Sequence, residues 1–271
     1  MEQSALMPAV ELVAALRSAG CVFAEEEAAI LLEAAGTAGI LTDMLALRTH
    51  GHPLEHIVGW AQFYGLRIAV APGVFVPRLR SEFLVSEALD ALLRMPSNNA
   101  GLRILDLCCG SGAIGAALTH RLTHRGHKVE LHAADIDPVA LECAARNIGP
   151  FHGTVHSGDL FAALPHELGS SFHIIVANAP YVPTSAIDFM PQEARVYEPE
   201  AALDGGIDGL AVQRRIALEA PAWLRPDGLL LIESSVRQAP KSAAIMGSHG
   251  FSTSIATNHD VDGTVVTGRM Q

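Results

Sequence analysis

The chain has few basic residues and few cysteines. Only 18 of its 271 residues are lysine or arginine, against 29 aspartates and glutamates, and the formal net charge is −11. Without a broad basic face the protein cannot neutralise a phosphate backbone, which argues against duplex nucleic acid as its main partner. The spacing of the four cysteines matches neither a zinc ribbon nor a disulfide framework, and indicates small buried thiols in a reducing compartment.

Long apolar runs are also missing. No stretch approaches the ~18 uninterrupted apolar residues of a membrane span, and the first residues lack the basic and then apolar pattern of a secretory leader. We therefore expect a soluble, cytoplasmic protein. The 13 histidines are scattered along the chain, so no metal site is expected. With 49% apolar and 17% charged residues, the composition is typical of a well-packed globular protein.

The pattern of apolar residues divides the chain into three parts. Between Ala5 and Arg48 apolar residues recur at helical spacing, which predicts a small helical unit. Between His50 and Arg78 alternating apolar residues flank the turn signal Ala71-Pro72-Gly73, which predicts a β-hairpin. We expect residues 1–58 to form the helical unit, residues 59–80 to form a hairpin linker, and residues 81–271 to form the main domain.

The main domain alternates short strands with helices of ten or so residues. The expected strands include RILDLCC, VELHAAD, FHIIVAN and GLLLIES. Such alternation predicts βαβ units and a parallel sheet with right-handed crossovers. The last two apolar segments, FSTSIAT and TVVTGRM, follow one another without a helix. We expect these two strands to pair antiparallel at one edge of the sheet.

A glycine-containing turn, LDLCCGSGAIG, follows the first strand of this domain. Ligands in open α/β sheets bind at the carboxyl ends of the strands. Gly110 and Gly112 would let the backbone approach a ligand closely, and Ser111 adds a small hydroxyl. A dinucleotide site would prefer G-x-G-x-x-G, and no basic residue lies nearby to hold a diphosphate. The turn therefore favours a nucleoside without phosphates.

Two acids at later strand ends support this interpretation. Asp135 falls about 23 residues after Gly112, close to the position at which an acid accepts hydrogen bonds from ribose hydroxyls. Asp137, directly before Pro138, fits the helix-capping role better and leaves Asp135 for the ligand. Asp159 with its neighbour Leu160 suits an adenine, whose amino group donates a hydrogen bond while its ring packs on the apolar side chain.

The ordered motifs LDLCCGSG, AADIDP, GDLF, VANAPYVP and EPEAALDGGIDGLAVQRRI resemble those of the class I S-adenosylmethionine-dependent methyltransferases, and specifically the HemK/PrmC group of protein-glutamine N5-methyltransferases. Upstream, GWAQFYGLRIAVAPGVFVPR resembles that group's hairpin and linker, and the helical N-terminus resembles its substrate-docking domain. The likeness covers nearly the whole chain. It implies a Rossmann-like, mostly parallel seven-stranded α/β sheet with an antiparallel edge, next to the small helical domain.

The resemblance also implies a chemistry. S-adenosylmethionine would be the methyl donor and S-adenosylhomocysteine the product. In the family an Asn-Pro-Pro-Tyr motif receives a glutamine side chain: the Asn oxygen and the next carbonyl accept its hydrogens, and the Tyr packs against it. The corresponding residues here are Asn178, Ala179, Pro180 and Tyr181. The implied cofactor contacts are Cys108, Cys109, Gly110, Ser111, Gly112, Asp135, Ile136, Asp159, Leu160 and Asn178.

The family's target is the Gly-Gly-Gln loop of peptide chain release factors, so the resemblance implies a protein partner that carries an exposed glutamine. Several departures indicate a divergent relative, a paralogue of the release-factor enzyme. Ala179 replaces a proline, Cys108 stands where the glycine loop normally opens with Gly-Thr, the linker reads PRLRSE, and the last hairpin reads DGTVVTG without the usual arginine.

Two other functions compete with this one. The same four-residue motif occurs in enzymes that methylate the exocyclic amino group of adenine, a chemically similar planar nitrogen. Those enzymes need a basic groove or a domain that reads nucleic acid. A chain with a net charge of −11 and a helical N-terminal unit offers neither. A catalytically silent protein that binds S-adenosylmethionine is the other alternative. A protein that had lost its catalytic activity would be expected to lose its hydrogen-bond acceptors first. This chain keeps Asn178, Tyr181, Asp135 and Asp159.

Overall fold

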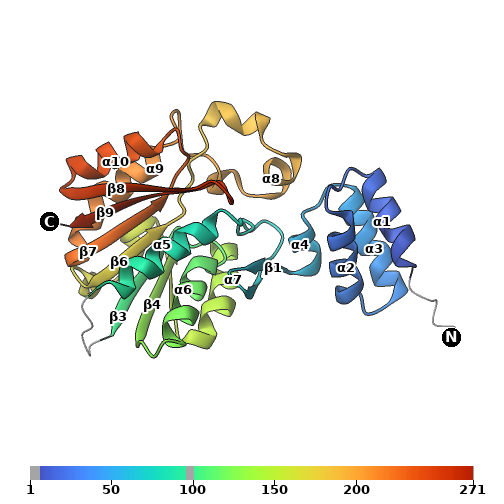
Figure 1. The fold of residues 1–271 in the computed structure, drawn as a ribbon, viewed down its shortest axis with the longest axis horizontal. Coiled ribbons are helices and arrows are strands. Elements are labelled where there is room, and N and C mark those ends of the chain that lie inside the picture. Colours follow the sequence, from blue (N-terminus) through green and yellow to red (C-terminus); the bar gives the residue numbers. More distant parts are fainter. Residues whose placement is uncertain (1–6, 96–100, 271) are drawn as a thin grey trace.

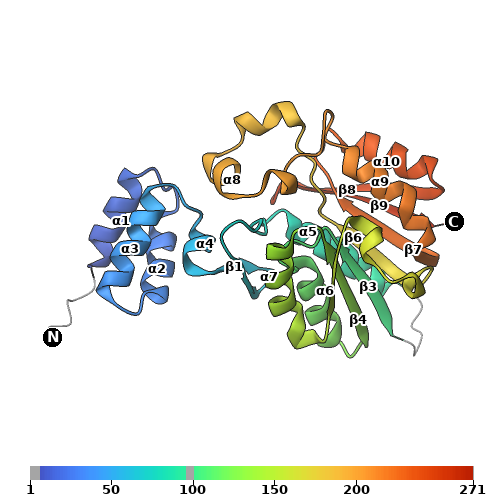
Figure 2. The same cartoon turned by 180° about the vertical axis from the view of Figure 1, so that it is seen from behind.

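The computed structural model describes residues 7–95 and 101–270. A helical unit near the N-terminus and an α/β unit that contains the C-terminal strand lie at opposite ends of the molecule, with a short hairpin between them (Figure 1, Figure 2). None of the helices in the described ranges is long and apolar enough to cross a membrane.

Four helices form the N-terminal unit: α1 (Ala9–Ser18), α2 (Ala24–Ala34), α3 (Ala38–Thr49) and α4 (Leu54–Val58). Their apolar faces meet in a core of their own around Leu12, Leu16, Leu31 and Leu41. The helical spacing in the sequence predicted this unit, although its expected first residue, Ala5, lies outside the described residues. The boundaries expected at 58/59 and 80/81 stay a prediction: α4 ends at Val58 and α5 begins at Ser81.

The hairpin exists, but its expected turn position was wrong. Strands β1 (Trp60–Phe63) and β2 (Leu66–Ala69) are joined by Tyr64 and Gly65, not by Ala71-Pro72-Gly73. Tyr64 and Gly65 have φ angles of 49° and 82°, as a tight two-residue hairpin turn requires. The later signal does make a turn, since Val74 N–H donates to Ala71 O at 3.0 Å. No strand follows it directly, because the next described element is α5.

The seven-stranded sheet has the order β5-β4-β3-β6-β7-β9-β8. Its parallel strands are β3 (Leu102–Leu107), β4 (Val129–Asp135), β5 (Thr154–Ser157), β6 (Phe172–Ala177) and β7 (Leu224–Glu233). The last two, β8 (Phe251–Asn258) and β9 (Gly263–Met270), pair antiparallel with each other, and β9 pairs antiparallel with β7. The sequence predicted this architecture, including the antiparallel edge.

Helices cover both faces of the sheet. One face carries α5 (Ser81–Leu93), α6 (Ala113–Thr123) and α7 (Pro138–Ile148), and the other carries α9 (Ala211–Glu219) and α10 (Ala239–Ser248). Neighbouring strand residues point to opposite faces, so Ile104 packs in the first core and Leu105 in the second. Because both faces are buried, these strands read as nearly continuous apolar runs.

A segment without counterpart in the sequence-based expectations lies between the sheet and the helical unit (Figure 1). It consists of the 3₁₀ turn η4 (Thr184–Phe189), the helix α8 (Gln192–Tyr197) and the 3₁₀ turn η5 (Glu200–Ala202). Contacts hold it to both neighbours. Tyr197 Oη donates to His50 O at 3.3 Å, and the buried Glu198 accepts from Arg78 at 2.6 Å and from Val76 N at 3.1 Å.

Arg48 connects the helical unit to this segment. Its guanidinium forms two hydrogen bonds, of 2.6 and 3.0 Å, with the carboxylate of Glu27, and Nη1 also contacts Glu193 of α8 at 2.5 Å. Arg48 and Glu27 are each only 9% exposed. The hydrogen bonds with Glu27 raise the pKa of Arg48 above its ordinary value, so the guanidinium stays protonated.

Replacing Arg48 by alanine leaves the Glu27 carboxylate buried without its partner. We expect Arg48→Ala to lower the free energy of unfolding by about 3 kcal/mol or more, the range for breaking a buried ion pair. Urea unfolding followed by circular dichroism measures this loss. The matched control is Arg17→Ala, whose partner Glu25 is 56% exposed, and a change below ~1 kcal/mol is expected there. Equal losses in both variants would contradict the structural role of Arg48.

Candidate active site

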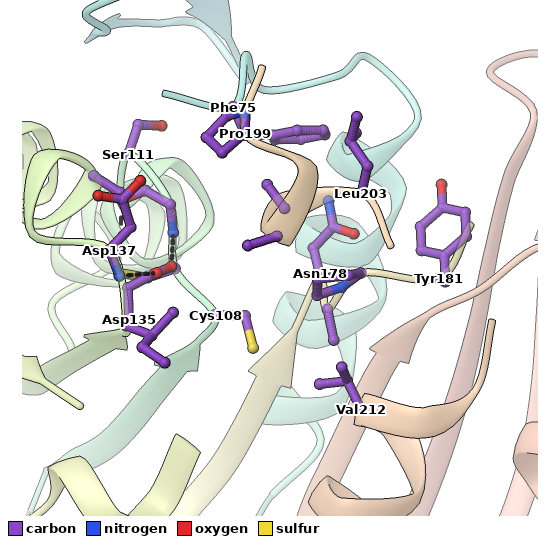
Figure 3. A pocket seen from close by; sticks show the side chains of 18 of the residues that line it. Phe75, Cys108, Ser111, Asp135, Asp137, Asn178, Tyr181, Pro199, Leu203 and Val212 are labelled. Carbon is purple, nitrogen blue, oxygen red and sulfur yellow. Dashed lines mark hydrogen bonds between the residues drawn. The ribbon is translucent and has the colours of Figure 1, made fainter. Parts of the chain in front are cut away.

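A cavity of about 760 Å³ lies at the carboxyl ends of the parallel strands. Its volume falls in the range of roughly 300–1,000 Å³ that is usual for small-molecule sites. Figure 3 shows Asp135 and Asn178 on opposite sides of it, with Cys108 between them. The cavity brings together nearly all the residues expected from the sequence: Cys108, Cys109, Gly110, Ser111, Asp135, Ile136, Asp159, Leu160, Asn178, Ala179, Pro180 and Tyr181.

Gly112 is the exception, and the reason for its being glycine differs from the expected one. It does not line the cavity. A Cβ at this position would lie 3.1 Å from Ala144 Cα and 3.1 Å from Ile148 Cγ2, both on α7. Gly112 precedes α6 with φ 74°, a conformation that favours glycine. It therefore allows close packing of α6 on α7, whereas Gly110, with φ 53° and open space beyond it, faces the cavity.

Asp106 holds the first turn of α6, directly after the glycine loop, and was not expected from the sequence. It lies within β3, is fully buried, and accepts a hydrogen bond from Gly115 N at 2.8 Å. Burial raises the pKa of Asp106 to about 8. The signal that could have identified it is an acid in the middle of an apolar strand, because a buried acid needs a specific partner.

Asp135 holds the loop from the neighbouring strand β4. One carboxylate oxygen accepts from Gly110 N at 2.8 Å and the other from Asp137 N at 3.0 Å (Figure 3). Asp137 caps α7, as expected, by accepting from Val139 N at 2.8 Å. Asp135 is therefore less free than its sequence position suggested. Each of its oxygens still has acceptor capacity, because a carboxylate oxygen carries two lone pairs.

Asp159 follows β5 and has a partner that the sequence did not reveal. Its carboxylate contacts Arg215 of α9 at 2.8 Å, and both side chains are about half exposed. The next residue, Leu160, is buried although it has a φ of 49°. The chain thus turns sharply after Asp159 and directs an apolar side chain toward the same cavity.

Asn178 follows the last residue of β6, at the opposite wall. Its Nδ2 donates to Ser81 Oγ at 3.2 Å, while no described residue hydrogen-bonds to its Oδ1. Ala179 is buried, and Tyr181 Oη donates to Glu233 Oε1 at 3.2 Å. Burial and the neighbouring Glu233 raise the pKa of Tyr181, so its hydroxyl remains a donor. The wall therefore offers an uncommitted amide oxygen to a ligand.

Sequence reasoning also missed the outer walls of the cavity. The linker and the segment around α8 contribute residues that are distant in sequence from the strand ends: Phe75, Pro77, Arg78, Arg80, Ser81, Met190, Pro199, Leu203 and Asp204. The motifs PRLRSE and EPEAALDGGIDGLAVQRRI contain most of these residues and belong to the resemblance. Their positions in the chain do not reveal that they reach the same cavity as Asn178.

The sheet order, the glycine loop and the acids at the ends of β4 and β5 define a class I S-adenosylmethionine-dependent methyltransferase. Residues 65–207 match the family model described as the methyltransferase small domain. A methyltransferase from Pyrococcus furiosus has the same fold, with a TM-score of 0.53 and 15% identity over 76% of this chain and 89% of that one.

Curated relatives narrow the class to one family. The release factor glutamine methyltransferase of Geobacter sulfurreducens is 37% identical over 77% of this chain and 69% of its own length. The enzyme of the same name from Bifidobacterium longum is 32% identical over 91% of this chain and 86% of its own. The chain belongs to the family of release factor glutamine methyltransferases, the HemK/PrmC group that its motifs resemble. Its cofactor is S-adenosylmethionine.

The residues present suit that cofactor. It combines an adenine, a ribose and a methionine chain, and the cavity provides apolar side chains, the carboxylates of Asp135 and Asp159, and the open space over Gly110. Cys108 narrows the cavity beside the glycine loop. It has a φ of 55° and places a side chain where the loop of the resembling family opens with glycine. The cavity remains large enough for the cofactor with Cys108 in place.

The two loop glycines allow a matched test of their different roles. Gly112→Ala adds backbone strain of roughly 1–2 kcal/mol and crowding against α7 of roughly 1–3 kcal/mol. Gly110→Ala adds only the strain, because nothing lies within 4 Å of the position that its Cβ would take. Both variants should fold, and Gly112→Ala should unfold at a clearly lower urea concentration than Gly110→Ala. Gly110→Ala should instead weaken S-adenosylmethionine binding in isothermal titration. Equal losses of stability would contradict the packing role of Gly112.

Proposed function

We propose that this protein transfers the methyl group of S-adenosylmethionine to the side-chain nitrogen (N5) of a glutamine in a peptide chain release factor. The observation that carries the proposal is the amide of Asn178 at the cavity wall: Nδ2 donates to Ser81, while Oδ1 accepts from none of the residues that the structure describes. The names of the curated relatives support the same acceptor.

The chemistry requires acceptors more than a strong base. A carboxamide nitrogen is a poor nucleophile, because its lone pair is delocalised into the carbonyl. Asn178 Oδ1 and the carbonyl of Ala179 would accept its two hydrogens and hold its nitrogen toward the methyl group. S-adenosylmethionine supplies that methyl group as an electrophile bound to a sulfonium. As the nitrogen–carbon bond forms, the carbon–sulfur bond breaks and its electron pair stays on sulfur. The methylated nitrogen is then strongly acidic and releases one proton to water.

Ala179 in place of the family's proline is compatible with this role. The acceptor is a backbone carbonyl, so it does not depend on the side chain. Ala179 is 1% exposed, and the surrounding packing restrains it even though the φ restriction of a proline is absent. Pro180 still restricts the backbone of Ala179 from the following position. The ring of Tyr181 completes the proposed acceptor pocket beside the substrate amide.

The cofactor roles are part of the same proposal. Asp135 would accept from the ribose hydroxyls through its remaining lone pairs, next to Ile136. Asp159 would accept from the adenine amino group, with Leu160 against the ring. The loop from Cys108 to Gly112 would border the methionine part, with Cys109, Gly110 and Ser111 along the cavity. Gly112 would contribute only through the packing of α6.

The protein partner would contact the N-terminal helical unit, residues 1–58, as its docking domain. The contacts of Arg48 and His50 with α8 support this, because they connect the helical unit to the rim of the cavity. A release factor as partner would place the reaction in the cytoplasm. No observation favours an adenine in nucleic acid as the acceptor, and the net charge of −11 opposes it.

Asn178→Ala tests the acceptor role. It removes the amide oxygen, so the rate of transfer should fall by about 100-fold or more, as for other preorganised contacts to a reacting group. Cofactor affinity, measured by isothermal titration, should change little. Loss of cofactor binding in proportion to the loss of activity would contradict the assigned role.

Asp135→Ala tests the ribose contact. We expect S-adenosylmethionine binding to weaken by about 1–3 kcal/mol, the cost of a lost polar contact. Asp137→Asn is the matched control, because asparagine also caps helices and Asp137 has no proposed cofactor role. A dissociation constant unchanged in Asp135→Ala would remove Asp135 from the cofactor site.

The acceptor itself is identified by incubating the purified protein with labelled S-adenosylmethionine and a cell lysate, followed by mass spectrometry of the labelled peptide. We expect the label on a glutamine of a release factor. Label on adenine in nucleic acid would support the alternative methyltransferase, and cofactor binding without any transfer would support a silent protein. Either result would overturn the proposed function.

A further inference from the structure

The side-chain amide of Gln238 joins three loops beside the cavity and has no part in the mechanism described above. Gln238 directly precedes α10 and does not itself line the cavity. Its Nε2 donates to Tyr181 O at 2.8 Å and to Asp208 O at 3.1 Å. Its Oε1 accepts from Ser235 Oγ at 2.6 Å. One amide therefore connects the loop after β6, the loop before α9 and the loop after β7.

The chemistry of these groups fixes the orientation of the Gln238 amide. Tyr181 O and Asp208 O are backbone carbonyls, which only accept hydrogen bonds, whereas the Ser235 hydroxyl donates one hydrogen. The amide nitrogen carries two hydrogens, so Nε2 serves both carbonyls while Oε1 takes the hydrogen of Ser235. With the amide reversed, its oxygen would face two carbonyl oxygens. The side chain thus uses both of its donors in a single orientation.

The backbone at Gly209 packs directly against the contact between Gln238 and Tyr181. A Cβ at Gly209 would clash with both Tyr181 O and Gln238 Nε2. Gly209 also has a φ of 72°, a conformation that favours glycine. Only a residue without a Cβ leaves this hydrogen bond intact, so the loop before α9 is shaped to accommodate it.

Tyr181 is held at two points by the end of β7 and the loop that follows. Its hydroxyl donates to Glu233 Oε1 at 3.2 Å, and its carbonyl accepts from Gln238 at 2.8 Å. The next amide, Val182 N, donates to Leu203 O at 3.0 Å, and Leu203 lines the cavity. The two contacts therefore restrain the ring and the backbone of Tyr181 together.

We propose that Gln238 is a positioning residue that acts through the backbone of Tyr181 to hold the NAPY motif, Asn178 to Tyr181, in the conformation that receives the methyl acceptor. The consequence for the reaction rests on the proposed function, in which the carbonyl of Ala179 and the ring of Tyr181 place the substrate amide. A shift of the Tyr181 backbone moves the ring and, through Pro180, that carbonyl. A displacement of about 1 Å at a reacting group costs roughly 100-fold in rate.

Hydrogen–deuterium exchange of the full chain, followed by NMR, tests the restraint without any methyl acceptor. Gln238→Leu removes both donors and leaves Tyr181 O and Asp208 O without this partner. The amides of Val182 and Thr184 are hydrogen-bonded in the adjoining segment. We expect them to exchange about 10-fold faster or more, and the increase to exceed that in β9, which responds only to overall stability. An increase no larger than that in β9 would overturn the proposal, whether or not the proposed function holds.

Kinetics with a purified release factor test whether the restraint matters for transfer. In Gln238→Leu, kcat for glutamine methylation should fall by about 10-fold or more, while the Kd of S-adenosylmethionine changes less than about twofold. Met246→Ala is the control, because Met246 is buried in α10 and does not line the cavity. This variant loses stability through a void in the core and should keep its kcat at temperatures well below unfolding.

The outcomes of the kinetic test separate the two proposals. If the wild-type enzyme methylates a glutamine and Gln238→Leu is equally fast, the positioning role fails while the proposed function stands. Equal losses of kcat in Gln238→Leu and Met246→Ala would also overturn the positioning role, because general loss of stability would then explain both. If the wild-type enzyme methylates no glutamine, the proposed function fails and the exchange measurement alone decides the role of Gln238.

Gln238→Glu adds a pH profile that general support of the fold would not produce. An ionised carboxylate only accepts, so it opposes both carbonyls, whereas a protonated carboxyl donates one hydrogen. The two carbonyls disfavour the ionised form. We expect kcat of this variant relative to wild type to rise as the pH falls from about 8 to about 5.5, as protonation restores one donor. The same ratio for Gln238→Leu should stay constant, and a constant ratio for Gln238→Glu would contradict the proposal.

Discussion

Carboxylates near the carboxyl ends of parallel strands hold the loops that form the cavity. Asp106 of β3 binds the backbone at Gly115, Asp135 of β4 binds it at Gly110, and Glu233 of β7 binds the side chain of Tyr181. Each acid is an acceptor that meets donors from another part of the chain. Because unpaired donors and acceptors are costly in a buried position, these pairs allow few alternative loop conformations.

Burial also changes the ionisation of these acids. Burial raises the pKa values of Asp106, Asp135 and Glu233, which means that the ionised forms are disfavoured in this environment. Of these three acids only Asp135 lines the cavity, so its carboxylate is the one that a bound ligand would meet directly.

The N-terminal unit and the cavity are joined by the segment around α8. Arg48 contacts this segment from the helical side, and Glu198 connects it with the linker at Arg78 and Val76. The segment also contributes Pro199 and Leu203 to the cavity wall. The segment around α8 therefore connects the helical unit with the wall of the cavity.

The sequence by itself determined the alternation of strands and helices, the antiparallel edge and the positions of Asp135, Asp159 and Asn178 at strand ends. Those features depend on the local periodicity of apolar residues and on short motifs. Only the tertiary structure decided the turn at Tyr64 and Gly65, the packing reason for Gly112, and the contact of Ser81 with Asn178. These three features depend on which distant segments come into contact. The periodicity of apolar residues indicates which face of an element is buried, but not which other element packs against that face.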